Sequence, residues 1–268
     1  MLAYRLIPFG LVNAGATFQR PMDIAFLGLI GKIMVVYLDD VTIFSRRGED
    51  HICHPKKNIE RCLRYGISLN PKKRVFTVLE GNLLRHIVSK SSIKKDPDWV
   101  QAITRIPHLV NKKSMQSFLG KISFLRKFIS AYAQIVKPMQ DMIKKYVVYT
   151  WGKKEKHAFA QIKQPIAEPP ALYNPYFKKD FLLYTFTFDN SLAAILTQKD
   201  ESNDDRPISF MSESMHRLEL NYLTIDKHAY AVYKVVKHFR PYLLKNHCIA
   251  FVPHPVVHTL QVQQELGE

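Results

Sequence analysis

The feature that most constrains this chain is an acidic pair, Asp39-Asp40, with runs of β-branched and apolar residues on both sides. The pattern over residues 33–45 predicts two short strands joined by a tight turn. Neighbouring side chains of a strand point to opposite faces, so a turn is needed for both carboxylates to reach one cleft. Paired carboxylates on a rigid hairpin suit hard cations such as Mg²⁺. The simpler interpretation is that Asp-Asp is a turn signal, because Asp is common in turns.

The composition points to a globular protein with a basic surface. The 268 residues, 47% of them hydrophobic, are enough for one large domain or two smaller ones. The net charge of +16 comes from basic pairs spread along the chain, which favours a nucleic-acid partner over a merely solubilising surface. Three cysteines give no disulfide framework, and no signal peptide or membrane-length apolar run is present. We therefore expect a cytoplasmic or nuclear location and no membrane partner.

Local patterns predict a mixture of helices and strands. Apolar periodicity predicts helices over residues 11–29, 49–65, three segments between 97 and 145, 151–166, 222–244 and 256–263. Strand patterns fall at residues 4–10, 75–79, 83–89 (after a turn at 80–82), 181–188, 193–198, 207–212 and 249–252. Pro21 is expected to kink or break the first helix. His51, Cys53 and His54 are interpreted as helix residues rather than a zinc site, because no matching Cys or His pair follows.

Several segments occur in an order and spacing typical of one family. They are Pro8 to Arg20, Tyr37 to Asp40, Leu69 to Lys73, Leu84 to Ser89, Ser117 to Gly120 and Trp151 to Leu172. Pro8 to Arg20 resembles the motif before the catalytic turn, Tyr37 to Asp40 the metal-binding turn, and Leu69 to Lys73 the motif that follows it. Leu84 to Ser89 resembles the primer-grip hairpin, Ser117 to Gly120 the thumb and connection region, and Trp151 to Leu172 the lead-in to a tethered RNase H-like domain. The family is the reverse transcriptases of gypsy-type LTR retrotransposon pol polyproteins, and the residues of these motifs are most similar to those of plant elements.

The resemblance implies an α+β fold in three parts. Residues 1–92 would form a partial polymerase palm, a β-hairpin with helices, and residues 93–150 a helical thumb and connection region. Residues 151–268 would form a small α/β domain that is RNase H-like. The resemblance covers essentially the whole chain, so it accounts for both the acidic hairpin and the α/β character of the second half.

The implied chemistry is RNA-directed DNA synthesis, a nucleotidyltransferase reaction with two Mg²⁺ or Mn²⁺ ions. Asp39 and Asp40 would be the catalytic metal ligands. The residues implied to contact the nucleotide, primer or template are Phe9, Gly10, Gln19, Tyr37, Lys72, Lys73 and His86. Phe9 as ordinary core and the two lysines as a solvated loop are the plainer alternatives. The implied partners are an RNA template, a DNA primer, an RNA–DNA hybrid, a dNTP and the rest of a pol polyprotein.

The sequence also departs from the family's pattern. The family's further Asp, from an earlier palm strand, has no counterpart in the printed sequence, and Asp23 is on the wrong element; we expect an incomplete metal site and no polymerase activity from this chain alone. The family's RNase H acids fall at Phe186, His228 and Pro253, so RNA cleavage is expected to be absent. Pro21, Pro55 and Arg85 stand where the family tends to have helix formers or Gly, as in a decaying copy.

Two functional interpretations therefore stand side by side. The first is a reverse transcriptase fragment that retains the polymerase turn, and the second is a non-catalytic nucleic-acid-binding remnant. An unrelated metal-binding α/β protein is a distant third. Binding to an RNA–DNA hybrid that weakens steeply with salt would separate the first two from the third.

Overall fold

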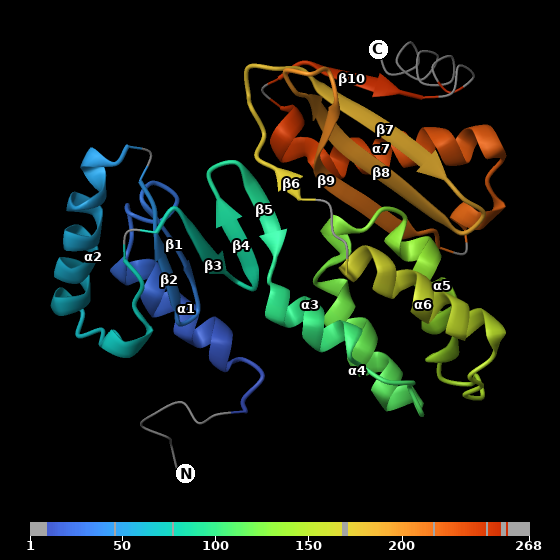
Figure 1. Cartoon of the computed structure of the whole chain (residues 1–268), viewed down its shortest axis with the longest axis horizontal. Coiled ribbons are helices and arrows are strands. Elements are labelled where there is room, and N and C mark those ends of the chain that lie inside the picture. The colour runs from blue at the N-terminus through green and yellow to red at the C-terminus, as the bar shows by residue number, and fades with distance from the viewer. Residues whose placement is uncertain are drawn as a thin grey trace. The chain divides into compact units, whose positions relative to one another are not determined.

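The computed structural model describes residues 10–45, 47–76, 78–167, 171–216, 218–244, 246–252 and 256. The chain divides between Leu79 and Glu80 into two compact units, called here the N-terminal unit and the C-terminal unit. Each unit combines helices with antiparallel strands (Figure 1). The expected α+β class is therefore confirmed, whereas the domain boundaries near residues 92 and 150 stay predictions.

The N-terminal unit is built around the acidic hairpin. Its elements are α1 (Ala14–Ala25), β1 (Met34–Tyr37), β2 (Asp40–Ile43), η1 (Glu49–His51), α2 (Cys53–Arg64) and η2 (Pro71–Lys73). Strands β1 and β2 pair antiparallel, with Tyr37 opposite Asp40, so that residues 38 and 39 form a two-residue turn. The predicted hairpin is confirmed, and the acidic pair lies at its tip.

The hairpin is anchored through one face of β1. Met34 and Val36 point inward and form an apolar core with Met22 and Phe26 of the α1 region and Cys62 of α2. The alternate residues of β1 are exposed, as the two-residue period of a strand requires. The core therefore fixes the hairpin on α1 and leaves its outer face and tip accessible.

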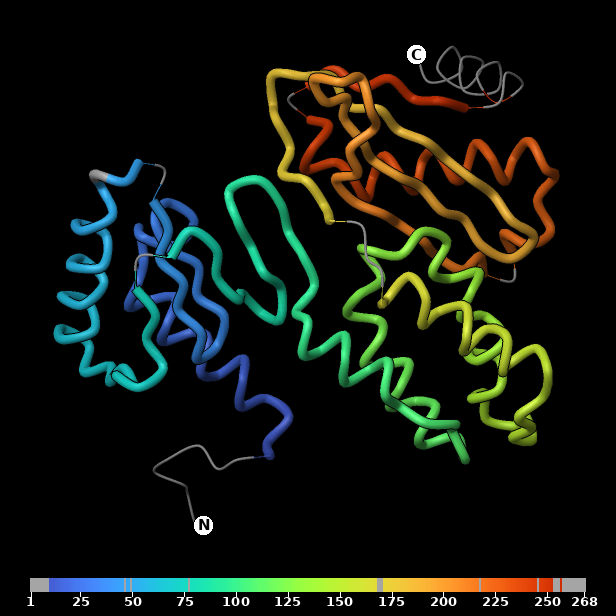
Figure 2. Tube along the Cα trace, in the orientation of Figure 1, coloured from blue at the N-terminus to red at the C-terminus, as the bar shows by residue number. Residues whose placement is uncertain are grey.

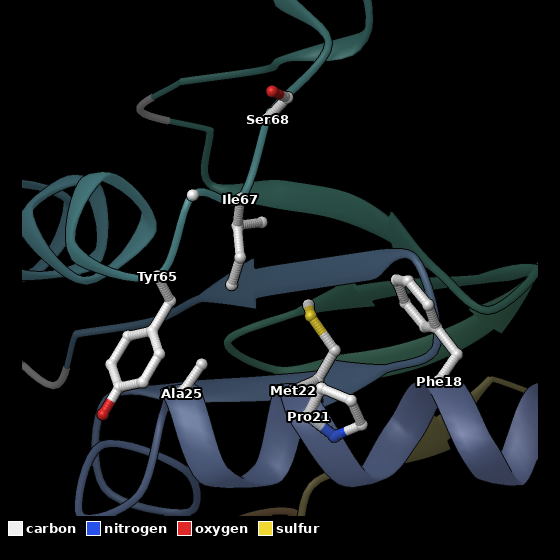
Figure 3. A pocket seen from close by; sticks show the side chains of 8 residues that line it. Phe18, Pro21, Met22, Ala25, Tyr65, Ile67 and Ser68 are labelled. Atoms are coloured by element: carbon white, nitrogen blue, oxygen red, sulfur yellow. The ribbon is translucent and has the colours of Figure 1, made fainter. Parts of the chain in front are cut away.

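Helix α1 differs from its prediction. Of the two expected effects of Pro21, a break in the helix is wrong, because α1 runs from Ala14 to Ala25 with Pro21 inside it, and a kink stays a prediction. It is shorter than predicted, and the chain turns between residues 26 and 29. Pro21 lines an apolar pocket of about 350 Å³ with Phe18 and Met22 of α1 and Tyr65 after α2 (Figure 3). Packing of the helix through its buried residues Met22 and Ala25 helps to explain how it tolerates a proline.

A four-stranded antiparallel sheet begins the C-terminal unit. It consists, in spatial order, of β3 (Glu80–Leu83), β4 (His86–Ser89), β5 (Ser92–Lys95) and β6 (Leu172–Tyr173). The predicted strand at 75–79 and turn at 80–82 are wrong, because residues 80–83 form a strand and the turn consists of Leu84 and Arg85. Pairing of β4 with β5, which local patterns did not reveal, fixes this register.

Helices cover the middle of the C-terminal unit. They are α3 (Pro97–Thr104), α4 (Lys112–Ser123), η3 (Arg126–Phe128), α5 (Tyr132–Met142) and α6 (Lys153–Ala167). Asn111 begins α4 as an N-cap, because its side chain accepts a hydrogen bond from the Ser114 backbone N–H at 2.8 Å. Buried residues at helical spacing, among them Met115, Phe118 and Ile122, join α4 to a core shared with α5 and α6. The helices predicted in this region are confirmed.

A second sheet completes the C-terminal unit. Its strands are β7 (Phe181–Thr187), β8 (Ser191–Lys199), β9 (Asp205–Ser214) and β10 (Cys248–Phe251), and η4 (Glu219–Asn221) and α7 (Thr224–Leu243) lie between the last two. The order is β10-β7-β8-β9, with β10 parallel to β7 and the other pairs antiparallel. Helix α7 runs along one face of this sheet (Figure 2). It packs there through Ala231, Val235 and Phe239, which belong to the buried core of this part. This arrangement confirms the predicted α/β character.

No helix among the described residues is both long enough and apolar enough to cross a membrane. The helix predicted over residues 256–263 lies outside the described residues except for Val256.

Candidate functional site

The tip of the β1–β2 hairpin brings the two predicted carboxylates together. Asp39 is the second turn residue and Asp40 begins β2, and both side chains are exposed. Neither carboxylate forms an ion pair with any residue that the structure describes. The tip therefore presents concentrated negative charge that is free to meet a cation.

The chemistry of this donor pair fits a hard divalent cation. Carboxylate oxygens are the ligands that Mg²⁺ and Mn²⁺ prefer in proteins. Within the described ranges, however, no group of three His, Cys, Asp or Glu side chains is arranged to hold a metal. Asp39 and Asp40 by themselves would thus supply only part of the coordination shell of such a cation.

The backbone at the tip is strained. Leu38 has a φ of +52°, in the left-handed region that costs a side-chain-bearing residue about 1–2 kcal/mol. Two-residue hairpin turns favour such positive φ values, and Gly usually supplies them. The strain is met by a hydrogen bond, since the Leu38 N–H donates to Oε1 of Gln19 at 2.7 Å. Gln19, predicted as a nucleotide or primer–template contact, therefore touches the turn itself.

The other predicted nucleotide contacts of the N-terminal unit lie on exposed segments. Tyr37 ends β1 with 54% of its side chain exposed, next to the acidic pair. Gly10 has a φ of +92° and is exposed, whereas Phe9 lies outside the described residues. Lys72 and Lys73 are exposed on η2, where the Asn70 side chain accepts a hydrogen bond from the Lys72 N–H at 3.0 Å.

His86 has a different environment from the other predicted site residues. It lies on β4 of the C-terminal unit, with only 7% of its surface exposed and its ring 4.6 Å from that of Phe124. Its Nδ1–H donates to the Leu84 carbonyl at 2.8 Å, and Nε2 is buried with no partner among the described residues. Burial, reinforced by the nearby Lys127 ammonium, lowers the pKa of His86. Its ring therefore contributes to packing in this structure.

The positions of the expected RNase H acids contain no acidic cluster among the described residues. Phe186 is 44% exposed on β7, and Pro253 lies outside the described residues. His228 lies on the first turns of α7, and its Nε2 is 2.7 Å from the hydroxyl oxygen of Thr187. Its Nδ1–H donates to the Thr224 carbonyl at 2.7 Å, so Nε2 of the neutral ring is the acceptor for Thr187. A hydrogen bond between Thr187 and His228 thus joins β7 to α7.

Two local hydrogen-bond networks were not predicted from the sequence. Thr187 was not a candidate, because its partner His228 is 41 residues away in the chain. Ser45 was not one either, yet its hydroxyl lies 3.1 Å from Nδ1 of His51 and 2.6 Å from Nδ1 of His54. The spacing of the two histidines was visible, but the serine that they share comes before the helix. This network fastens the end of the hairpin to the start of α2.

Comparison of the chain with known protein families gives two matches. Residues 2–122 match the family described as "Reverse transcriptase (RNA-dependent DNA polymerase)". Residues 151–250 match the "RNase H-like domain found in reverse transcriptase". The chain is therefore similar to a reverse transcriptase over its first part and to the RNase H-like domain found in reverse transcriptases over its second.

Curated proteins to which the chain is similar include Pol polyproteins of transposons. The chain is 36% identical over 265 residues to the retrovirus-related Pol polyprotein from transposon 297 of Drosophila melanogaster, covering 98% of this chain and 25% of that protein. It is 28% identical over 240 residues to the transposon Tf2-3 polyprotein of Schizosaccharomyces pombe, covering 90% of this chain and 18% of that protein. The chain thus spans a quarter or less of the length of these relatives.

Solved structures show the same fold. A foamy viral protease-reverse transcriptase in complex with dsDNA matches with a TM-score of 0.75 at 18% identity, covering 96% of this chain and 53% of that one. The same kind of protein in complex with an RNA/DNA hybrid matches with a TM-score of 0.74 and covers 91% of this chain and 33% of that one. At this level of identity the likeness establishes the fold, which is that of a reverse transcriptase with an RNase H-like region.

Proposed function

We propose that this chain is part of an RNA-directed DNA polymerase from a gypsy-type, plant-like LTR retrotransposon. The observation that carries the proposal is the two-residue turn at which Asp39 and Asp40 are both exposed, at the end of a hairpin whose inner face packs in the apolar core. The motifs around the turn and the similarity to transposon Pol polyproteins support it. Its three parts are residues 1–92 as palm, 93–150 as thumb and connection, and 151–268 as the RNase H-like domain.

In this proposal Asp39 and Asp40 hold Mg²⁺ or Mn²⁺. When bound, a pair of such ions makes the primer 3′ hydroxyl a better nucleophile and stabilises the leaving pyrophosphate. Tyr37, exposed beside the turn, positions the primer–template, and Gly10 leaves its backbone open to the incoming dNTP. The exposed ammonium groups of Lys72 and Lys73 attract the triphosphate.

The proposed partners are an RNA template, a DNA primer and the hybrid that they form. Thirty-nine Lys and Arg against 23 Asp and Glu give the chain the positive charge that a phosphate backbone attracts. The foamy viral relative with the same fold has been solved with an RNA/DNA hybrid, which supports this choice of partner. The rest of a Pol polyprotein is a further proposed partner.

We further propose that the RNase H-like domain does not cleave RNA. Hydrolysis by two metal ions needs clustered carboxylates. The described residues at the corresponding place are Phe186, Thr187 and His228, and the last two satisfy each other by a hydrogen bond. The domain then serves to bind nucleic acid or to support its neighbours.

A second candidate function is a non-catalytic nucleic-acid-binding module. The observation in its favour is that no third metal-ligating side chain joins Asp39 and Asp40 within the described ranges. Two carboxylates on one turn bind a divalent cation weakly, so synthesis by this chain alone is expected to be slow or absent. The two candidates share a nucleic-acid partner and differ in chemistry.

Primer extension on an RNA template with Mg²⁺ or Mn²⁺ tests the proposal, with the wild type beside Asp40→Asn. Circular dichroism and a cooperative melt establish that both proteins are folded. Extension by the wild type that disappears in Asp40→Asn supports the polymerase. Absence of extension from a folded protein that still binds a hybrid supports the non-catalytic module. Absence of both extension and hybrid binding contradicts both candidates.

A further inference from the structure

The strained turn is held by one stripe of helix α1. Gly15, Gln19 and Asp23 follow one another at intervals of four residues, so they share a face of the helix. A Cβ atom added at Gly15 would lie 3.4 Å from Cδ2 of Leu38, which shows how closely that side chain approaches the helix. The backbone of Leu38 is bound to the same stripe by the hydrogen bond to Gln19.

The amide of Gln19 has a single orientation that satisfies its neighbours. Oε1 accepts from the Leu38 N–H at 2.7 Å, and Nε2 donates to Oδ1 of Asp23 at 2.8 Å and to the Val36 carbonyl at 3.4 Å. A rotated amide would place its NH₂ group against the Leu38 N–H and its carbonyl against the Asp23 carboxylate. Two donors would then face each other, as would two acceptors, so Asp23 fixes which way the amide points.

We infer that Gln19 is a positioning residue for the metal-ligating turn, oriented by Asp23. It holds Leu38 in its left-handed conformation, and Leu38 directly precedes Asp39, so the hydrogen bond sets the direction in which both carboxylates leave the hairpin. The inference rests on the proposed function, because it assigns a purpose to the position of Asp39 and Asp40. It gives Gln19 a role through the turn rather than through contact with nucleic acid.

Two variants of equal net charge test the inference. Gln19→Met removes both ends of the amide and keeps a helix-forming side chain of similar length. The double variant Gln19→Glu with Asp23→Asn restores the series of hydrogen bonds with the donor and acceptor between positions 19 and 23 exchanged. A Glu at position 19 accepts from the Leu38 N–H with one carboxylate oxygen, and an Asn at position 23 donates to the other oxygen. Gln116→Met, on an exposed position of α4 in the other unit, is the matched control.

The readouts are the hydrogen exchange of the Leu38 amide and the affinity for Mn²⁺ alone, followed through water-proton relaxation. Gln19→Met is expected to speed Leu38 exchange and to weaken Mn²⁺ binding, each by about tenfold, because one well-formed hydrogen bond is lost. The double variant is expected to return both quantities to within about twofold of the wild type. Gln116→Met is expected to change neither.

Two results would overturn parts of this picture, and they are distinguishable. Unchanged Leu38 exchange and unchanged Mn²⁺ affinity in a folded Gln19→Met protein would refute the positioning role. Mn²⁺ binding by the wild type that is no weaker in Asp40→Asn would refute the metal site itself. In that second case Leu38 exchange still decides whether Gln19 holds the turn.

Discussion

Two residues of the β3–β4 turn occupy a backbone region in which glycine is usual. Leu84 has a φ of +49° and Arg85 a φ of +61°. A two-residue hairpin turn demands such values, and neither residue is the glycine that would adopt them without strain. The Arg85 guanidinium lies 4.1 Å from the centroid of the Trp99 ring, a cation–π contact that offsets part of it. The turn is thus stabilised by a side-chain contact rather than by its own residue types.

This balance predicts a difference between two substitutions of Arg85. Arg85→Ala loses the contact with Trp99 and keeps the left-handed strain, whereas Arg85→Gly loses the contact and removes the strain. Arg85→Gly is therefore expected to be more stable than Arg85→Ala by about 1 kcal/mol. Urea titrations at equal m-values measure the difference. Equal stability of the two variants would show that the turn is not strained in solution.

Lys95 is a buried cation with no carboxylate beside it in the described structure. Its side chain is on β5 with 4% exposure, and Nζ donates to the Pro165 carbonyl at 2.7 Å. Desolvation lowers the pKa of Lys95 from 10.5 to about 8. The unfolded chain therefore binds this proton more tightly than the folded one, and folding is penalised while the group is charged.

The sign of this shift predicts that stability rises with pH above neutrality. Between pH 7 and 9 the folded group loses its proton before the unfolded one does, which adds about 1 kcal/mol to the free energy of unfolding. Lys95→Met removes the titration and is expected to flatten this rise. Urea titrations of both proteins at pH 7, 8 and 9 give the comparison. A rise of equal size in Lys95→Met would assign it to other groups.

At the scale of elements, helix α1 makes different contacts on two of its faces. One face packs on the hairpin and binds the turn, and an adjoining face lines the apolar pocket with Phe18 and Pro21. A proline in a helix interior removes one hydrogen bond and clashes with the preceding turn. The helix persists because tertiary packing, rather than local propensity, supplies most of its stability.

Two proline substitutions separate these contributions. Pro21→Ala restores a backbone donor inside α1 and is expected to stabilise the N-terminal unit by about 1–3 kcal/mol. Pro97→Ala is the control, because Pro97 is the first residue of α3, where proline is favourable, so no gain is expected. Chemical denaturation followed by far-UV circular dichroism measures both changes. A loss of stability in Pro21→Ala would mean that the ring's packing in the pocket outweighs the missing hydrogen bond.

The link between β7 and α7 gives a further prediction. Thr187→Val keeps the shape of the side chain and leaves Nε2 of His228 without its donor. The C-terminal unit is expected to lose about 1 kcal/mol of stability, the usual net value of one such hydrogen bond. Thr185→Val on the same strand is the control. A double variant with His228→Leu is expected to lose little more than either single change, and additive losses would contradict the pairing.

The elements that sequence patterns predicted well are those with a local cause. The β1–β2 hairpin was found because apolar β-branched runs surround one polar turn, and α4 because Asn111 precedes a clear apolar stripe. Strands β5 and β6 were missed, since Ser92 to Lys95 carries two lysines and acquires its strand character from distant partners. The turn at Leu84 and Arg85 was misplaced because Gly81 and Asn82 are far better turn residues.

In the candidate site, too, features with a local cause could be predicted from the sequence and contacts between distant residues could not. Asp39 and Asp40 could be identified from the sequence, because an acidic pair inside an apolar hairpin is unusual. The contact between Gln19 and Leu38 spans 19 residues, and nothing in either residue type predicts it. His86 was placed on the correct hairpin, but its burial against Phe124 comes from a helix region almost 40 positions away. Residue type thus indicates chemistry, while long-range packing decides orientation and exposure.

At the scale of the whole molecule, positive charge is in large excess. The net charge of +16 means that at least 16 of the 39 lysines and arginines have no acidic counterpart, and the ion pairs of the described residues engage few of the others. Repulsion among these groups opposes folding, and a polyanion that neutralises them is bound favourably. Release of counterions from nucleic acid would provide the driving force.

This excess of positive charge predicts that the chain binds an RNA–DNA hybrid in a salt-dependent way. The same samples test whether the RNA strand is cleaved. For contacts to about four or more phosphates, a plot of log Kd against log salt should rise with a slope of at least about 3.5. Fluorescence anisotropy with a labelled 20-base-pair hybrid at 50–200 mM salt measures the slope. Gel analysis of the same samples with Mg²⁺ follows the RNA strand, which is expected to stay intact if Phe186 and His228 occupy the positions of the acids, as proposed above. A slope near zero would refute a phosphate-backbone interface, and RNA fragments that persist in a His228→Leu variant would place hydrolysis at a different site.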